Sequence, residues 1–263
     1  MMNLIRADLY AILRGKAIYI TFAVMLLLHI LVIGTRTAGG VNFGGAESMA
    51  LDIPVFTFDG LGSVALLYTR MDNLAFYLLP LIIAASAPIF TYGTVKNDLA
   101  WGVSRTKLYL SKLSVAIGLC VFMMLFYMVI GVLFATALNG FGGPIPAGYL
   151  LSVFQTLGAQ LFMMVALTCI GVFLVFTTKR TAIVTGVYIA FYFVPAMVIM
   201  LLMESGFNVA RLLEFDVMLG INRLGFISQL ETRSIITILS VGAAYILATT
   251  IGGIALFRRA EIK

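Results

Sequence analysis

Few side chains in this sequence could carry chemistry. His29 is the single histidine, and the two cysteines, Cys120 and Cys169, both fall within apolar runs. A single histidine does not supply the several ligands of a His-rich metal site or the second histidine of a Ser–His relay. No serine is flanked by glycines in the way of a nucleophilic serine on a sharp turn. We therefore expect His29 to hydrogen-bond a neighbouring helix, and we predict no catalytic residue, disulfide framework or metal site.

Nucleotide binding and ion coupling also lack their usual residues. No GxxxxGK[ST] phosphate-binding loop occurs, so the chain does not bind a nucleotide by that route. None of the eleven acidic residues lies near the middle of an apolar run, and Asp72 and Glu204 are expected at helix ends. Ion-coupled carriers usually keep a titratable group within the bilayer. If the chain takes part in pumping a substrate, the energy must come from another polypeptide. A channel or a facilitator, which needs no energy source, remains an alternative function.

The composition is that of a membrane protein. Hydrophobic residues make up 62% of the 263 residues and charged residues only 11%, whereas soluble domains carry about 25% charged residues. An apolar stretch of about 20 residues crosses the bilayer as a helix. The sequence therefore predicts an all-α, polytopic protein, a single transmembrane domain over residues 1–263, with six transmembrane helices at about 17–34, 74–93, 113–138, 149–176, 181–203 and 235–257.

The positive charges predict the orientation of these helices. Segments 1–16, 94–112, 177–180 and 258–263 hold twelve of the 17 Lys and Arg residues. The remaining loops hold eight of the eleven acidic residues. Loops rich in Lys and Arg stay in the cytoplasm, so we expect both termini to be cytoplasmic. The net charge of +6 therefore reports topology, and no nucleic-acid partner is predicted.

Three segments outside the spans have their own character. Residues 1–16 carry Ile5, Leu9, Ile12 and Leu13 at helical spacing, which predicts an amphipathic interfacial helix on the inner leaflet. The outer loop 34–73 is Gly-rich and contains Pro54, so we expect it to be irregular. The outer loop 204–234 is apolar enough to dip back into the outer leaflet.

The loop 94–112 is the most informative segment. Lys96 to Trp101 can form a short helix that Gly102 ends, and Ser104 is a plausible N-cap for the next helix. Leu99 and Trp101 are expected to project from this short helix as an exposed apolar pair, which invites a protein partner. Basic side chains at the start of the next helix are expected to anchor it at the lipid headgroups: Arg105, Lys107 and Lys112.

The run Gly-Val-Ser-Arg-Thr-Lys-Leu-Tyr-Leu-Ser-Lys, preceded by Gly-Thr, resembles the first cytoplasmic loop of ABC-2 type transporter permeases. It is most similar to the Gram-positive group that handles lantibiotics, bacitracin and amphipathic peptide toxins. The sharp match is confined to residues 93–112, while the plan of six spans and an N-terminal amphipathic helix resembles the family over the whole chain. The resemblance implies a bacterial plasma membrane protein.

The resemblance also implies roles for individual residues. Residues 97–102 would form a coupling helix that docks on a separate ATPase, and the implied coupling residues are Asn97, Leu99, Trp101, Gly102 and Arg105. Lys179 and Arg180 would give a second contact. Pro80, Pro88 and Pro195 lie in spans that border the path in the family, so they could act as hinges or as ordinary packing kinks.

These observations predict the permease subunit of an ATP-driven exporter. The chain itself would bind no cofactor, and ATP and Mg²⁺ would bind to the partner ATPase, present in two copies. A second permease copy would complete the path as a homodimer or heterodimer in contact with membrane lipids. The expected cargo is an amphipathic or hydrophobic peptide, which suggests peptide transport and antimicrobial resistance. A stand-alone channel or facilitator and a non-transporting structural protein remain the alternatives.

Overall fold

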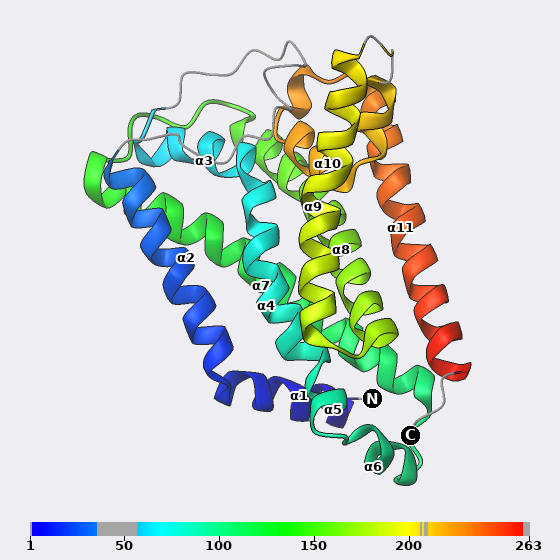
Figure 1. The fold of residues 1–263 in the computed structure, drawn as a ribbon. Coiled ribbons are helices and arrows are strands. Elements are labelled where there is room, and N and C mark those ends of the chain that lie inside the picture. The colour runs from blue at the N-terminus through cyan, green and yellow to red at the C-terminus, as the bar shows by residue number, and fades with distance from the viewer. Residues whose placement is uncertain (1, 36–56, 206, 208–209, 260–263) are drawn as a thin grey trace.

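The structure is a bundle of long helices. The computed structural model describes residues 2–35, 57–205, 207 and 210–259, and these contain helices and no strand. Five helices are long and apolar enough to cross a membrane (Figure 1): α2 (Lys16–Gly34), α7 (Arg105–Asn139), α8 (Tyr149–Thr178), α9 (Thr181–Glu204) and α11 (Thr232–Arg259). The predicted all-α, polytopic class is therefore confirmed.

Helix α8 forms the centre of the bundle. It contacts α4, α7, α9, α10 and α11 along its length. Met163, Met164 and Leu167 on α8 are completely buried. Gly242 of α11 lies so close to α8 that a Cβ atom there would be 2.6 Å from the Met163 sulfur. A small residue thus lets two helices approach closely, as is common within membranes.

The predicted span 74–93 is not one continuous helix. Helix α4 (Leu74–Ser86) ends before the one-turn helix α5 (Pro88–Thr91) begins. Pro88 has no backbone N–H to continue the hydrogen-bond ladder, and it occupies the first position of α5, where that donor is not needed. Pro80 lies inside α4 without ending it.

The region before α4 is more ordered than the sequence predicts. In place of an irregular loop, residues 60–69 form α3 (Gly60–Thr69), which packs against α7. Asp59 caps α3 by accepting a 2.6 Å hydrogen bond from the Gly62 N–H. A short 3-10 helix, η2 (Met71–Asn73), then leads into α4, and the chain bends by 63° between α3 and the half formed by η2 and α4. Counted as one span, the pair gives a sixth candidate; Pro54 lies outside the described residues.

The N-terminal helix α1 (Met2–Arg14) lies across one end of the bundle and is followed directly by α2 (Figure 1). The predicted single apolar face is divided in two. Ile12 is buried and Ile5 is half-buried against the protein, whereas Leu9 and Leu13 are exposed. The helix therefore presents one apolar strip to the bundle and another away from it.

The opposite end of the bundle holds the predicted apolar loop 204–234. It contains η3 (Ala210–Phe215), α10 (Val217–Leu224) and η4 (Ile227–Gln229). Asp216 caps α10, because its Oδ1 accepts hydrogen bonds from the Met218 N–H at 2.7 Å and from the Leu219 N–H at 3.1 Å. The apolar side chains of α10 pack inside the protein, against α8 and α3.

His29 lies between α2 and α7, but it contacts α7 through its ring and not through the predicted hydrogen bond. Its Nδ1 lies 2.8 Å from the carbonyl oxygen of Met25, in its own helix α2. The neighbouring helix α7 contributes a ring contact instead, because Tyr127 meets the imidazole edge-on with the ring centres 4.5 Å apart. The prediction of a hydrogen bond to a neighbouring helix is therefore wrong, since the preceding turn already supplies the acceptor.

Candidate functional site

The candidate site is the α6 segment, defined here as residues 92–104 between α5 and α7. It contains the short helix α6 (Val95–Ala100) and lies at the same end of the bundle as α1 and the last turn of α11 (Figure 1). Gly93 and Gly102 flank α6, and both have left-handed backbone angles, with φ of +66° and +80°. Glycine adopts this conformation without strain, so each marks a sharp change of chain direction.

The end of α6 is a Schellman motif. The Val103 N–H donates to the carbonyl of Asp98 at 3.2 Å, and the Gly102 N–H donates to the carbonyl of Leu99 at 3.0 Å. This pair of bonds requires a left-handed residue just after the helix, which explains why Gly102 stands there. The predicted N-cap of the next helix is confirmed, because the Ser104 hydroxyl accepts a hydrogen bond from the Lys107 N–H at 3.3 Å.

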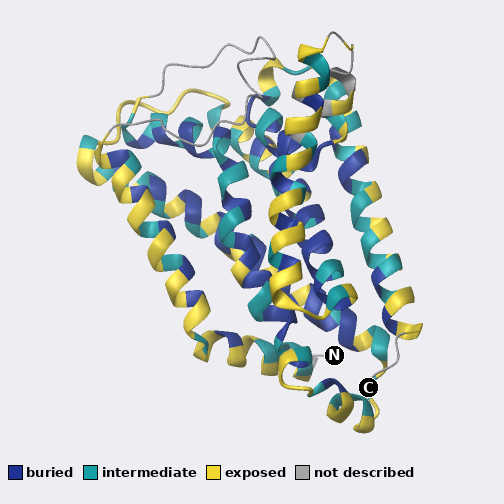
Figure 2. Ribbon diagram, in the orientation of Figure 1, coloured by how far each residue is buried: buried dark blue, intermediate teal, exposed yellow. Residues whose placement is uncertain are grey.

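The two sides of the α6 segment differ in exposure (Figure 2). Val95 is buried, and Leu99 is half-buried against the core. Trp101 has an exposed fraction of 88% and Tyr92 of 78%. The expected exposed pair of Leu99 and Trp101 is therefore wrong for Leu99, which instead helps to fix α6 to the bundle. The exposed aromatic side chains of the α6 segment are Trp101 and Tyr92.

Arg105 joins the start of α7 to the end of α11. Its Nη1 donates to the carbonyl oxygens of Phe257 at 3.2 Å and Arg258 at 2.8 Å. These carbonyls lie in the last turn of α11, where a helix has unpaired acceptors and partial negative charge. Arg105 thus contacts protein through its Nη1, and the residue remains partly exposed.

Arg105→Met is expected to loosen the end of α11. Hydrogen bonds from a charged donor contribute about 1.5–3 kcal/mol, so amide exchange in the last turn of α11 should quicken by about tenfold or more. Hydrogen–deuterium exchange of the peptide that covers residues 252–259 measures this. Arg105→Lys retains the charge, so its exchange rate should lie between those of the unsubstituted chain and Arg105→Met. Unchanged exchange in Arg105→Met would contradict the role of Arg105 in holding the end of α11.

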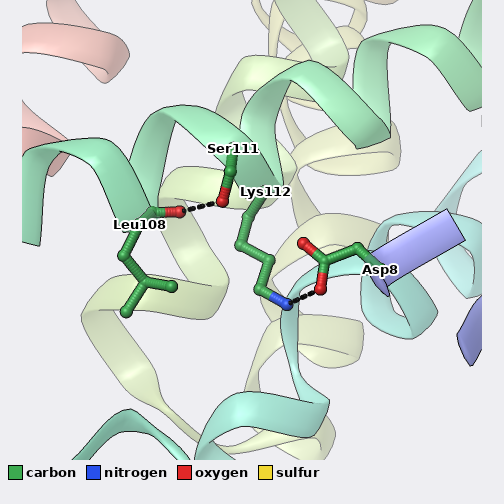
Figure 3. Close-up of polar contacts among 4 residues, drawn as sticks. All are labelled: Asp8, Leu108, Ser111 and Lys112. Carbon is green, nitrogen blue, oxygen red and sulfur yellow. Dashed lines mark hydrogen bonds and ion pairs between the residues drawn. The ribbon is translucent and has the colours of Figure 1, made fainter. Parts of the chain in front are cut away.

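Lys112 and Asp8 form a buried ion pair between α7 and α1. Figure 3 shows the two side chains pointing toward one another, and the Lys112 Nζ lies 2.6 Å from the Asp8 Oδ1. Their side chains are only 7% and 17% exposed. In the same turn of α7, the Ser111 hydroxyl donates to the Leu108 carbonyl at 2.9 Å. The expectation that Lys112 reaches the headgroups is therefore wrong, because a carboxylate of the same chain neutralises it.

The other predicted site residues lie outside the α6 segment, except for Asn97. Asn97 is exposed on α6 itself. Lys179 and Arg180 are exposed in the turn between α8 and α9, at the same end of the bundle (Figure 1). Lys179 has a left-handed φ of 55°, and its N–H closes α8 by donating to the Val175 carbonyl. Pro195 lies inside α9, which continues past it.

The Asp8–Lys112 pair was missed by sequence reasoning, although the sequence carries a signal for it. Asp8 lies between Ile5 and Ile12 at spacings of three and four residues, which places a carboxylate within an apolar strip. A charge in such a strip is costly unless a partner of opposite sign faces it. The identity of that partner depends on how α1 crosses α7, which sequence spacing does not give.

Comparison with known proteins gives the family. A search of curated proteins returned no match. The family model described as ABC-2 family transporter protein matches residues 4–196, which is well over half of the chain and includes the whole α6 segment. The chain therefore belongs to the ABC-2 transporter family, whose members are the membrane permease component of ABC transporters and not the ATPase itself.

Proposed function

We propose that this chain is the permease subunit of an ATP-driven exporter and that the α6 segment is its docking site for a separate ABC ATPase. The exposure of Trp101 carries the proposal. A tryptophan held outward at the tip of a connection is typical of an interface anchor, because large aromatic side chains dominate binding energy when a partner buries them. A stand-alone channel or a structural protein would not require it.

The charge distribution supports a cytoplasmic position for the α6 segment. Helix α1, the start of α7, the turn between α8 and α9 and the end of α11 all gather at this end of the bundle (Figure 1). Basic residues are concentrated in these elements, on α6 and at the start of α2: Arg6, Arg14, Lys16, Lys96, Arg105, Lys107, Lys112, Lys179, Arg180, Arg258 and Arg259. Positively charged loops favour the cytoplasmic side, so both termini would lie on the cytoplasmic side of a bacterial plasma membrane.

The transported molecule is proposed from the resemblance of residues 93–112. It would be an amphipathic or hydrophobic peptide, exported or cleared from the membrane, as in peptide-antibiotic resistance. Two permease chains, identical or related, would form the path, and two ATPase subunits would bind ATP and Mg²⁺. Lys179 and Arg180 would add a minor contact to the ATPase. Pro80, Pro88 and Pro195 would allow the helices that contain or border them to bend.

Affinity purification of the full-length chain from its native membrane tests the proposal. A soluble subunit with a GxxxxGK[ST] motif is expected to co-purify in equal amounts, and the complex should hydrolyse ATP. Amphipathic peptides should stimulate that hydrolysis in lipid vesicles. A chain that purifies without any ATP-hydrolysing subunit would contradict the docking site, whereas stimulation by lipids or small drugs alone would contradict the peptide cargo.

A further inference from the structure

The ammonium group of Lys112 joins the start of α7 to α1. Lys112 belongs to α7 and its Nζ is paired with Asp8 of α1 at 2.6 Å. Asp98, on α6, belongs to the same electrostatic cluster. Burial raises the pKa of the Asp98 carboxyl above its ordinary value, the Lys112 ammonium opposes that rise, and the Asp8 carboxylate adds to it. The buried Lys112 cation is therefore paired directly with the first helix, and the α6 segment runs into the same end of α7 through the Ser104 cap.

The ion pair has features of a rigid joint. Both side chains are mostly removed from solvent, so separating α1 from α7 would leave an uncompensated buried charge, which is strongly unfavourable. Apolar contacts flank it, because Ile12 on α1 and Leu108 on α7 are both buried. Helix α1 packs against α7 and α4 as well as α2, so it is more than a membrane anchor.

We propose that the Asp8–Lys112 ion pair makes α1, α6 and the adjoining end of α7 one mechanical unit, with Lys112 as its positioning residue. The inference rests on the proposed function of the α6 segment. When the ATPase displaces that segment, α1 moves with it, and α1 in turn leads directly into the first long helix α2. The interfacial helix is thereby a moving part of the transporter.

Distances between labels test this inference in the purified complex with its ATPase. One pair of spin labels, at Ala7→Cys and Ser114→Cys, spans α1 and α7 within the unit. A second pair, at Ala7→Cys and Phe154→Cys, spans the unit and the opposite end of α8. All three positions are exposed, whereas the native Cys120 and Cys169 are buried. Labelled chains are diluted with unlabelled chains so that each distance is measured within one subunit.

In the unsubstituted chain, trapping of nucleotide on the ATPase should change the Ala7–Phe154 distance and leave the Ala7–Ser114 distance fixed. In Lys112→Met, the Ala7–Ser114 distance should shift or broaden on trapping, and the Ala7–Phe154 change should be lost. Lys112→Arg, which keeps the cation, should behave as the unsubstituted chain does. Lys107→Met is the matched control, since Lys107 is an exposed lysine on the same helix.

The outcomes separate this inference from the proposed function. If the ATPase co-purifies and Lys112→Met responds to nucleotide as the unsubstituted chain does, the inference is overturned and the docking site stands. If no ATPase co-purifies with the unsubstituted chain, both fail. Should Lys112→Met misfold because Asp8 is left as an unpaired buried charge, Asp8→Asn/Lys112→Met removes both charges and is expected to give the same loss of fixed distance.

Discussion

Trp101→Ala is expected to uncouple the ATPase from the permease while leaving the helical bundle intact. An aromatic anchor at the centre of an interface contributes about 2–4 kcal/mol, and each 1.4 kcal/mol is about tenfold in affinity. Docking should therefore weaken by about 30-fold or more. Because the Trp101 side chain is 88% exposed, its removal takes almost nothing from the packing of the bundle. Titration of the ATPase against the permease in lipid vesicles, with ATP hydrolysis as the signal, measures the change.

Two further variants give this experiment its controls. Trp101→Phe keeps an aromatic ring and should recover much of the affinity. Phe154→Ala removes a ring that is 71% exposed near the opposite end of α8, and it should leave ATP hydrolysis unchanged. Each variant should unfold at the same temperature as the unsubstituted chain. Full ATPase coupling in Trp101→Ala would mean that the α6 segment is not the docking site.

Gln160→Leu is expected to destabilise the bundle strongly. Gln160 is fully buried on α8, and its Nε2 donates to the Tyr68 carbonyl at 2.6 Å and to the Ile221 carbonyl at 3.0 Å. These carbonyls lie near the C-terminal ends of α3 and α10, where helices lack internal partners. Leucine would leave both carbonyls unpaired in an apolar interior, at a cost of about 2–5 kcal/mol.

The expected readout is a fall in the unfolding temperature on the order of 10 °C for the detergent-solubilised chain. Gln155→Leu is the matched control, because Gln155 is exposed on the same helix. It should unfold within a degree or two of the unsubstituted chain, as surface substitutions generally do. Equal unfolding temperatures for the two variants would show that the side chain of Gln160 does not hold α3 and α10 to α8.

Local patterns predicted the elements whose causes are local. Long apolar runs require helices in a membrane, because no water is available there to pair the backbone. Ser104 and Gly102 also act through bonds to residues within a few positions, so the cap of α7 and the end of α6 at Gly102 could be predicted from the sequence. Pro88 was predicted as a hinge or a packing kink within one span, and the end of α4 before it was not predicted, because the apolar run continues across it.

Features that depend on how helices cross could not be predicted in the same way. Leu99 is half-buried because α6 folds back on the core, and nothing in its own sequence distinguishes it from Trp101. Gln160 gains its two acceptors from segments 92 and 61 residues away. Helix α3 lies in a Gly-rich stretch, where the cap by Asp59 and the packing against α7 outweigh weak helix propensity.

The length of α7 has a consequence for motion. Its 35 residues make a rod of about 52 Å, far longer than the roughly 30 Å hydrocarbon layer. A rod pivoting about its far tip by about 10° sweeps its near tip through about 9 Å. A small rotation of α7 at one side of the bilayer therefore gives a large displacement of its end at the other side. Modest rearrangements among the spans are enough to move the segments that α7 carries beyond the headgroups.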